Sequence, residues 1–147
     1  MHKPVALPAL LLATFAAGVA VGRHPTAAAA DPTLPAAERV FELRTYTTAP
    51  GRLPALHQRF RAHTTTLFER HGMTNVGYWT PTDSAGAGNT LVYLLAHPSR
   101  EAARQSWAAF GRDPEWQRVH RASEADGTIV ERIESVFLDP VDYSPMR

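Results

Sequence analysis

Hydrophobic and polar residues alternate along residues 40–47, which is the pattern of a β-strand with two different faces. The predicted faces are Phe41, Leu43 and Thr45 on one side and Glu42, Arg44 and Tyr46 on the other. After a turn at 49–51, apolar residues recur at helical spacing over residues 53–71. Gly72 then suits the position just past the end of that helix. The domain is therefore predicted to begin with a strand followed by an amphipathic helix.

Further strands and helices are predicted along the rest of the chain. Strands are expected at 74–80, 90–97 and 128–138, and the second of them is apolar at nearly every position, which indicates burial on both faces. Ser99 and Asp113 are good N-cap residues for two successive helices. The resulting order β-α-β-β-α-β predicts the α+β class, with a ferredoxin-like antiparallel sheet that carries its helices on one face.

The other face of this predicted sheet has no helix to cover it. We expect it to carry Tyr46, Trp79 or Tyr78, and apolar residues of the last two strands. An apolar surface of that extent is unfavourable in water. The pattern therefore predicts a homodimer in which two sheets pack face to face.

The first thirty residues differ in composition from the rest and predict an export signal. Lys3 precedes a mainly apolar run at 5–21, and the small residues Ala28 and Ala30 suit a signal cleavage site. The predicted division is 1–30 for the signal peptide, 31–39 for a linker and 40–147 for the domain. The mature protein would then be periplasmic or extracellular. The alternative is an uncleaved N-terminal membrane anchor, which would place the domain at a membrane.

Composition excludes several classes of function. Without residues 1–30 the chain holds 13 Arg against 14 acidic residues, which gives no electrostatic reason to expect a nucleic-acid partner. The absence of Cys excludes disulfides, thiol catalysis and thiolate metal sites. The later histidines lack the HExxH spacing, and the chain has no glycine-rich nucleotide motif. We therefore expect neither a metal nor a cofactor.

A series of short motifs extends along the domain. They are FELRTY at 41–46, PGRL at 50–53, ERHG at 69–72, VGYW at 76–79, DPEWQ at 113–117 and DYSP at 142–145. In this order and spacing the chain resembles the NIPSNAP family, of the dimeric α+β barrel superfamily. The resemblance implies a ferredoxin-like subunit and a barrel-forming dimer, and it names no reaction. Family members are often cytosolic or organellar, so the predicted export signal is a departure from them.

Glu42, Arg44 and Tyr46 would share one strand face, where an acid, a base and a phenol could line a cavity and act on a ligand. The alternative is an Arg–Glu pair across strands, with partners in the last strand. These partners would be Glu131, Glu134 or Arg132.

His63 is the best single histidine candidate for proton transfer or ligand binding, because either His63 or Thr64 falls near the buried stripe of the first helix. A core histidine bonded to a neighbour explains that position as well. Tyr78 and Trp79 are candidate binding residues, and His97 is expected at an edge or turn of the sheet.

Two functions are compatible with these observations. The first is an exported small-molecule-binding or accessory homodimer without a defined biochemical role, with a small apolar ligand. The second is a cofactor-independent monooxygenase or isomerase that acts on a small aromatic or apolar substrate in the barrel cavity. This hypothesis rests on fold analogy alone. Haem binding through His63 is a third possibility, which also rests on analogy. A cavity with His63, Arg44 or Tyr46 beside Trp79 would favour the enzyme, and a closed apolar core would exclude it.

Overall fold

The computed structural model describes residues 39–83 and 85–146, so the predicted signal peptide and nearly all of the predicted linker lie outside the described residues. The strands are β1 (Val40–Thr48), β2 (Thr74–Trp79), β3 (Thr90–His97) and β4 (Val130–Leu138). The helices are α1 (Leu53–Arg59), the π-helical segment η1 (Phe60–Thr64), α2 (Thr65–Arg70), α3 (Arg100–Arg112) and α4 (Pro114–Ser123). In these ranges no helix combines the length and the hydropathy that crossing a membrane would need.

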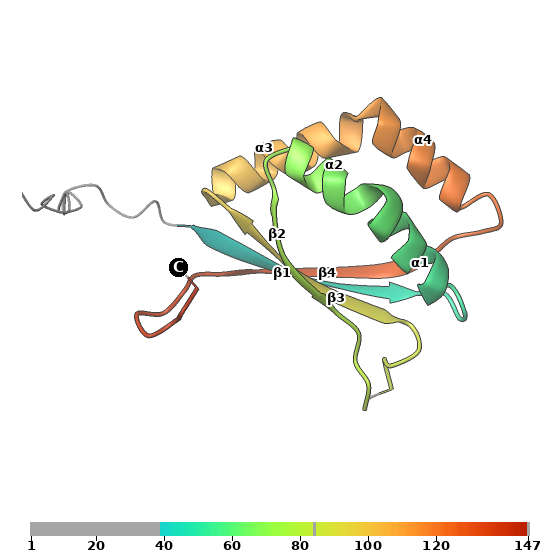
Figure 1. Ribbon diagram of the computed structural model, residues 1–147, viewed down its shortest axis with the longest axis horizontal. Helices are drawn as coiled ribbons and strands as arrows, with labels where there is room; N and C mark the ends of the chain where they lie inside the picture. The colour runs from blue at the N-terminus through green and yellow to red at the C-terminus, as the bar shows by residue number, and fades with distance from the viewer. Residues whose placement is uncertain (1–38, 84, 147) are drawn as a thin grey trace, which may run out of the picture. The chain divides into compact units, whose positions relative to one another are not determined.

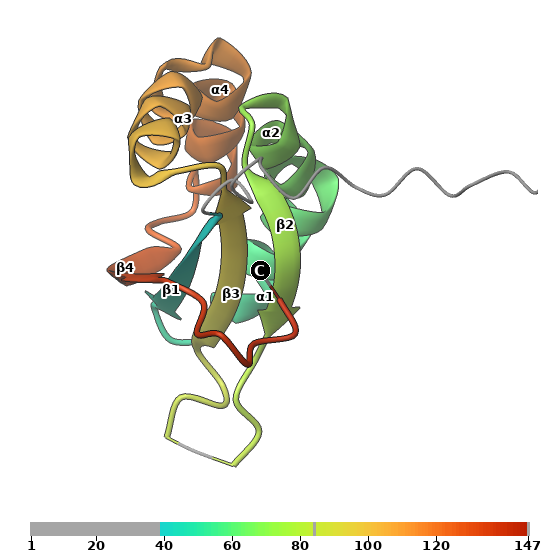
Figure 2. The same ribbon diagram turned by 90° about the vertical axis from the view of Figure 1, so that its left-hand side faces the viewer.

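The four strands form one antiparallel sheet in the order β2-β3-β1-β4. Figure 1 shows the helices together on one side of this sheet, and Figure 2 shows the pair α3–α4 beside the run α1–α2. This arrangement confirms the predicted α+β class and the ferredoxin-like plan. The strand at 90–97 was predicted to be buried on both faces, and as central strand β3 it is buried at every position except Val92.

Local capping explains where the helices begin and end. The Ser99 hydroxyl accepts a hydrogen bond from the Ala102 N–H at 3.0 Å, and the Asp113 carboxylate accepts from the N–H groups of Glu115 and Trp116 at 2.7 and 3.2 Å. Each cap satisfies backbone donors that the first helical turn leaves free. Gly72 has a φ of 75°, the left-handed conformation that a chain needs to leave a helix sharply.

The core between the sheet and the helices is rich in aromatic rings. Tyr46 meets Phe60 and Tyr93 edge to face, with ring centroids 6.1 and 5.2 Å apart, and Tyr78 stacks on Tyr93 at 5.5 Å. The prediction that Tyr46 lies on the uncovered face is therefore wrong, because its side of β1 packs against the helices. Tyr78 is also packed on the helix side, whereas Trp79 is 54% exposed.

The face of the sheet without helices is apolar across three strands. Leu43 on β1 lies opposite Leu94 on β3 and Val136 on β4, and Phe41 occupies the same face opposite Leu138. On the edge strand β4, Val136 and Leu138 are 54% and 40% exposed, whereas Phe41, Leu94 and Ala96 are buried, at 7%, 9% and 2%. We name this the sheet patch; its residues are Phe41, Leu43, Leu94, Ala96, Val136 and Leu138.

Candidate functional site

A cavity of about 240 Å³ lies between the helices and the β1–β4 side of the sheet. Its apolar wall consists of Phe60, Phe68, Phe110, Trp116, Val130 and Ile133. Its polar lining consists of Tyr46, Arg59, Thr64, His120 and Glu124. We call this space the inner cavity; mostly aromatic walls with a few polar groups are typical of small-molecule sites.

Arg59 is the most unusual residue of the inner cavity, because its guanidinium is buried with only 3% of the side chain exposed. Its Nη1 donates to Ser123 Oγ at 3.2 Å and pairs with Glu124 Oε1 at 3.3 Å. The guanidinium carbon lies 5.5 Å from the centre of the Trp116 ring. Within the described part of the chain, the buried Nε–H of Arg59 has no acceptor, which is also true of the Nε atoms of Arg44 and Arg52; of these three arginines only Arg59 lines the inner cavity. A buried donor without a partner is costly, so a ligand acceptor beside it would be favoured.

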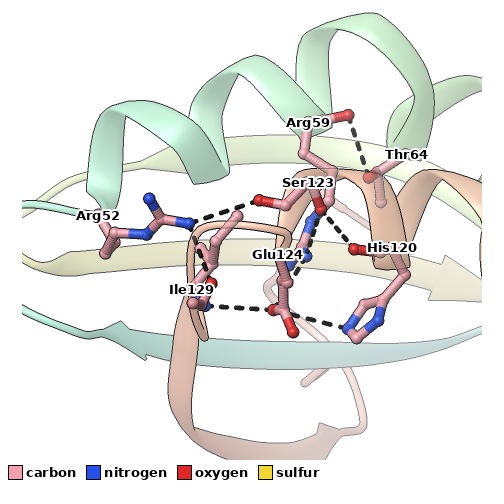
Figure 3. Close-up of polar contacts among 8 residues, drawn as sticks. Arg52, Arg59, Thr64, His120, Ser123, Glu124 and Ile129 are labelled. Atoms are coloured by element: carbon pink, nitrogen blue, oxygen red, sulfur yellow. Dashed lines mark hydrogen bonds and ion pairs between the residues drawn. The ribbon is translucent and has the colours of Figure 1, made fainter.

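Glu124 connects Arg59 to the other polar groups at this end of the cavity. Its carboxylate accepts from the Ile129 N–H at 3.2 Å and lies 3.6 Å from His120 Nε2. Arg52 donates to the carbonyls of Ser123 and Gly127, and Figure 3 shows both arginines reaching from the α1 side to the segment after α4. These contacts join α1 to the end of α4 and to the segment after it, so the polar end of the cavity is pre-formed.

The π-helical segment η1 decides which residues face the inner cavity. The Thr65 N–H donates to the carbonyl of Phe60, five residues back, and this wider turn adds one residue to the helix. The hydroxyls of Thr64 and Thr65 donate to the carbonyls of Arg59 and Phe60, at 3.2 and 3.3 Å. Thr64 is consequently buried in the cavity wall. A uniform helical period over 53–71 could not decide whether His63 or Thr64 occupies that position.

A second buried polar group centres on Glu42, which does not line the inner cavity. Its carboxylate accepts from Trp107 Nε1 at 2.6 Å, from Ser135 Oγ at 2.6 Å and from His97 Nε2 at 3.0 Å. Burial acts to raise the pKa of Glu42, but these three hydrogen bonds and the Arg44 charge together outweigh it and lower that pKa.

The surroundings of Glu42 correct two predictions. The partner of Arg44 is Glu42 on the same strand, at 3.3 Å, and the residue that β4 supplies is Ser135 rather than Glu131, Glu134 or Arg132. The prediction that His97 lies at an edge or turn of the sheet is wrong. β3 is a central strand, and His97 is only 1% exposed.

Arg44 also has a packing role. Its guanidinium carbon lies 4.0 Å from the centre of the Trp107 ring, a cation–π distance. Arg44 and Glu42 therefore form part of the packed contact between β1 and α3.

The remaining predicted site residues lie in different places. His63 lines a groove of about 320 Å³ between α1–η1 and α4, which Arg59 also lines, and Trp79 lines a cleft beside β2. Tyr46 alone among the predicted residues reaches the inner cavity, where the tryptophan is Trp116 rather than Trp79. The functional roles proposed for these residues stay predictions.

The sequence did not single out Arg59, His120 or Glu124. Arg59 and Glu124 are 65 residues apart, and neither belongs to a short motif, so only the fold brings them together. Trp116 belongs to the motif DPEWQ, for which the sequence predicted no binding role. Over the described ranges, no cluster of three or more His, Asp or Glu side chains could hold a metal ion.

Comparison with known proteins gives a family and a fold. The family model described as NIPSNAP matches residues 41–145. A solved NIPSNAP family protein of unknown function from Agrobacterium tumefaciens is 23% identical, covering 76% of this chain and 96% of its own, with a TM-score of 0.64. An uncharacterized NIPSNAP domain protein from Burkholderia xenovorans is 25% identical over 72% and 98% of the two chains, with a TM-score of 0.61.

A more distant structural relative has a described activity. SnoaB, a cofactor-independent oxygenase from Streptomyces nogalater, is 17% identical over 74% of this chain and 98% of its own, with a TM-score of 0.52. At that identity the likeness shows a shared fold. Among curated proteins, none matches this chain.

Proposed function

The chain belongs to the NIPSNAP family, and from the inner cavity we propose that it binds a small aromatic molecule that carries a hydrogen-bond acceptor. The observation that carries this proposal is the buried Arg59, with an unpartnered Nε–H, beside a wall of aromatic rings. A volume of about 240 Å³ is below the roughly 300–1,000 Å³ of sites for drug-sized ligands, so one-ring molecules fit it best.

Filling the cavity tests this proposal. Ile133 lines the cavity and is 50% exposed, so Ile133→Trp should obstruct the space without disrupting the core. Val141→Trp is the matched control, because Val141 is 49% exposed and lies outside the cavity lining. Calorimetric titration of the full chain with 4-hydroxyacetophenone should show binding that Ile133→Trp abolishes and Val141→Trp retains. Equal binding by both variants would exclude the inner cavity.

Arg59 can be tested in the same titration. Arg59→Lys keeps a cation near Glu124 but removes the Nε–H and the planar guanidinium, so binding should weaken about tenfold. Toluene, which has the ring without an acceptor, should bind the wild type and this variant equally. An unchanged affinity for 4-hydroxyacetophenone in Arg59→Lys would show that the guanidinium does not contact the ligand.

A second function, cofactor-independent turnover of that ligand, is favoured by the contact between His120 and Glu124. The carboxylate lies 3.6 Å from the imidazole nitrogen, which is beyond hydrogen-bond distance, so its charge rather than a hydrogen bond would favour the protonated imidazole of a general base; both residues line the inner cavity. An isomerase needs such a base to move a proton. His120→Gln should then bind ligand and lose turnover; turnover that persists in this variant would exclude the role of His120.

We also propose that two copies pair through the sheet patch. Arg132 and Glu134 lie 3.7 Å apart on β4, opposite Thr47 and Thr45, and so on the same face as Leu43. Opposite charges side by side on one face match a second copy turned by a two-fold axis. Because Phe41, Leu94 and Ala96 are already buried within one copy, a second copy would cover chiefly Leu43, Val136 and Leu138.

The dimer is tested by sedimentation velocity at micromolar concentration. The wild type should be a dimer, and Val136→Glu should be a monomer because it would place a charge in the sheet patch. Ala108→Glu, on the exposed surface of α3, is the control and should stay dimeric. A monomeric wild type, or a dimeric Val136→Glu, would contradict the proposed interface.

Export remains part of the proposed function, supported by the apolar run and the small residues at 28 and 30. Mass spectrometry of the protein from its native host should find a chain that begins at Asp31. An intact N-terminus would contradict cleavage and favour the anchor.

A further inference from the structure

A second concave site lies on the β2 side of the molecule, with a volume of about 390 Å³. Its lining consists of His57, Phe60, Arg61, Thr65, Tyr78, Trp79, Thr80 and Leu91. We call it the outer cleft. Phe60 lines both the outer cleft and the inner cavity, whereas the polar groups of the two sites are different residues.

The charged groups of the outer cleft are basic. Arg61 and His57 are four residues apart along the α1–η1 run, and no carboxylate is among the lining residues. Within the described ranges, neither side chain forms an ion pair or a hydrogen bond with another residue. Burial first, and then the nearby Arg61 charge, lower the pKa of His57. A guanidinium without a carboxylate partner, beside an imidazole that can donate a hydrogen bond, favours an anion.

Trp79 gives the outer cleft an exposed aromatic surface. The ring lies against Gly77, where an added Cβ would be 2.5 Å from a ring carbon, so any larger residue at 77 would displace it. The ring is 54% exposed, although an indole is usually covered or in contact with a partner. By contrast, the Tyr78 hydroxyl already donates to Asn75 Oδ1, and its ring is packed in the core.

From this combination we propose that the outer cleft binds a planar aromatic carboxylate. The ring would stack on Trp79, and the carboxylate would pair with Arg61 and accept a hydrogen bond from His57. A neutral apolar ligand would leave the guanidinium unused, and an inorganic anion would leave the indole exposed. The site is distinct from the inner cavity, because Phe60 is the one lining residue that the two have in common.

The test is calorimetric titration of the full chain with 2-naphthoate and, separately, with the neutral 2-naphthamide. Arg61→Gln should weaken 2-naphthoate binding at least tenfold and leave 2-naphthamide binding unchanged. Arg121→Gln, an exposed arginine of α4 outside both sites, is the matched control and should bind 2-naphthoate as the wild type does. Equal affinity of the wild type and Arg61→Gln for 2-naphthoate would overturn the proposal.

Two further variants separate this site from the inner cavity. Gly77→Ala should displace the Trp79 ring and weaken 2-naphthoate binding, with an unchanged far-ultraviolet circular dichroism spectrum as evidence of folding. Ile133→Trp fills the inner cavity and should leave 2-naphthoate binding intact. If Ile133→Trp abolishes that binding, or if 2-naphthoate does not bind the wild type at millimolar concentration, the outer cleft is not the site.

Discussion

At the scale of single residues, burial of charge distinguishes this domain from a plain apolar core. Glu42 and Arg59 are 2% and 4% exposed, yet each has hydrogen-bonding partners from distant parts of the chain. Buried charges are tolerated only when such partners replace water. The Glu42 carboxylate receives several donors from the protein, whereas Arg59 keeps one donor free beside the inner cavity. Within the described ranges, the buried Nε of Arg44 and Nδ1 of His97, near Glu42, also have no partner, so the ligand-binding role of Arg59 is proposed from its place in the wall of the inner cavity.

The first prediction concerns Glu42 and pH. Because the folded state lowers the pKa of Glu42, its stabilisation is fully present above the unfolded-state value near 4.5 and is lost as pH falls through the lowered value. Glu42→Gln should reduce the free energy of unfolding by about 2 kcal/mol at pH 7, because it weakens charge-assisted hydrogen bonds in a buried site. Urea unfolding should show a smaller difference between variant and wild type at pH 3. A difference that is the same at both pH values would contradict this.

At the scale of elements, Asp113 joins the end of one helix to the start of another. It caps α4, and His71 at the end of α2 donates from Nε2 to its carboxylate at 2.7 Å. That hydrogen bond from His71 is the main cause of the lowered pKa of Asp113, which burial opposes. The same carboxylate therefore fixes the relative position of two helices that line the inner cavity.

The second prediction separates these two roles of Asp113. Asp113→Asn keeps a capping oxygen and loses the charge, whereas Asp113→Ala loses both, so the Tm should fall in the order wild type, Asn, Ala. Ser99→Ala removes only the cap of α3 and serves as the comparison. Differential scanning calorimetry at pH 7 gives the four midpoints. Equal Tm values for the two Asp113 variants would show that the cap contributes nothing.

The elements also show why the sequence predicted the fold better than the site. Caps at Ser99 and Asp113 depend on residues two or three positions away, so they are visible in the sequence. The inner cavity depends on η1, whose extra residue departs from the 3.6-residue period and places Thr64 where His63 was an alternative. The run of threonines at 64–66 was the available signal, since their hydroxyls can bond the carbonyls that a π-turn frees.

At the scale of the whole molecule, the sheet separates two surfaces of different character. The inner cavity lies on the helix side of the sheet, and the sheet patch lies on the opposite side. Figure 2 shows the sheet and the helices that pack on it. Pairing of two copies through the sheet patch would leave the helix side open to ligand. The contacts that define the cavity join residues far apart in the chain, such as Arg59 and Glu124, and so could not be predicted from local pattern.

The most direct test of the central claim, ligand binding in the inner cavity, uses the three tryptophan indoles as separate reporters. Trp116 lines the inner cavity, Trp79 lines the outer cleft, and Trp107 is bonded to Glu42. In a titration of ¹⁵N-labelled protein with 4-hydroxyacetophenone, the Trp116 indole N–H signal should shift to saturation while the signals of Trp79 and Trp107 stay in place. A titration that leaves the Trp116 signal unmoved, or that shifts only Trp79, would contradict ligand binding between the sheet and the helices.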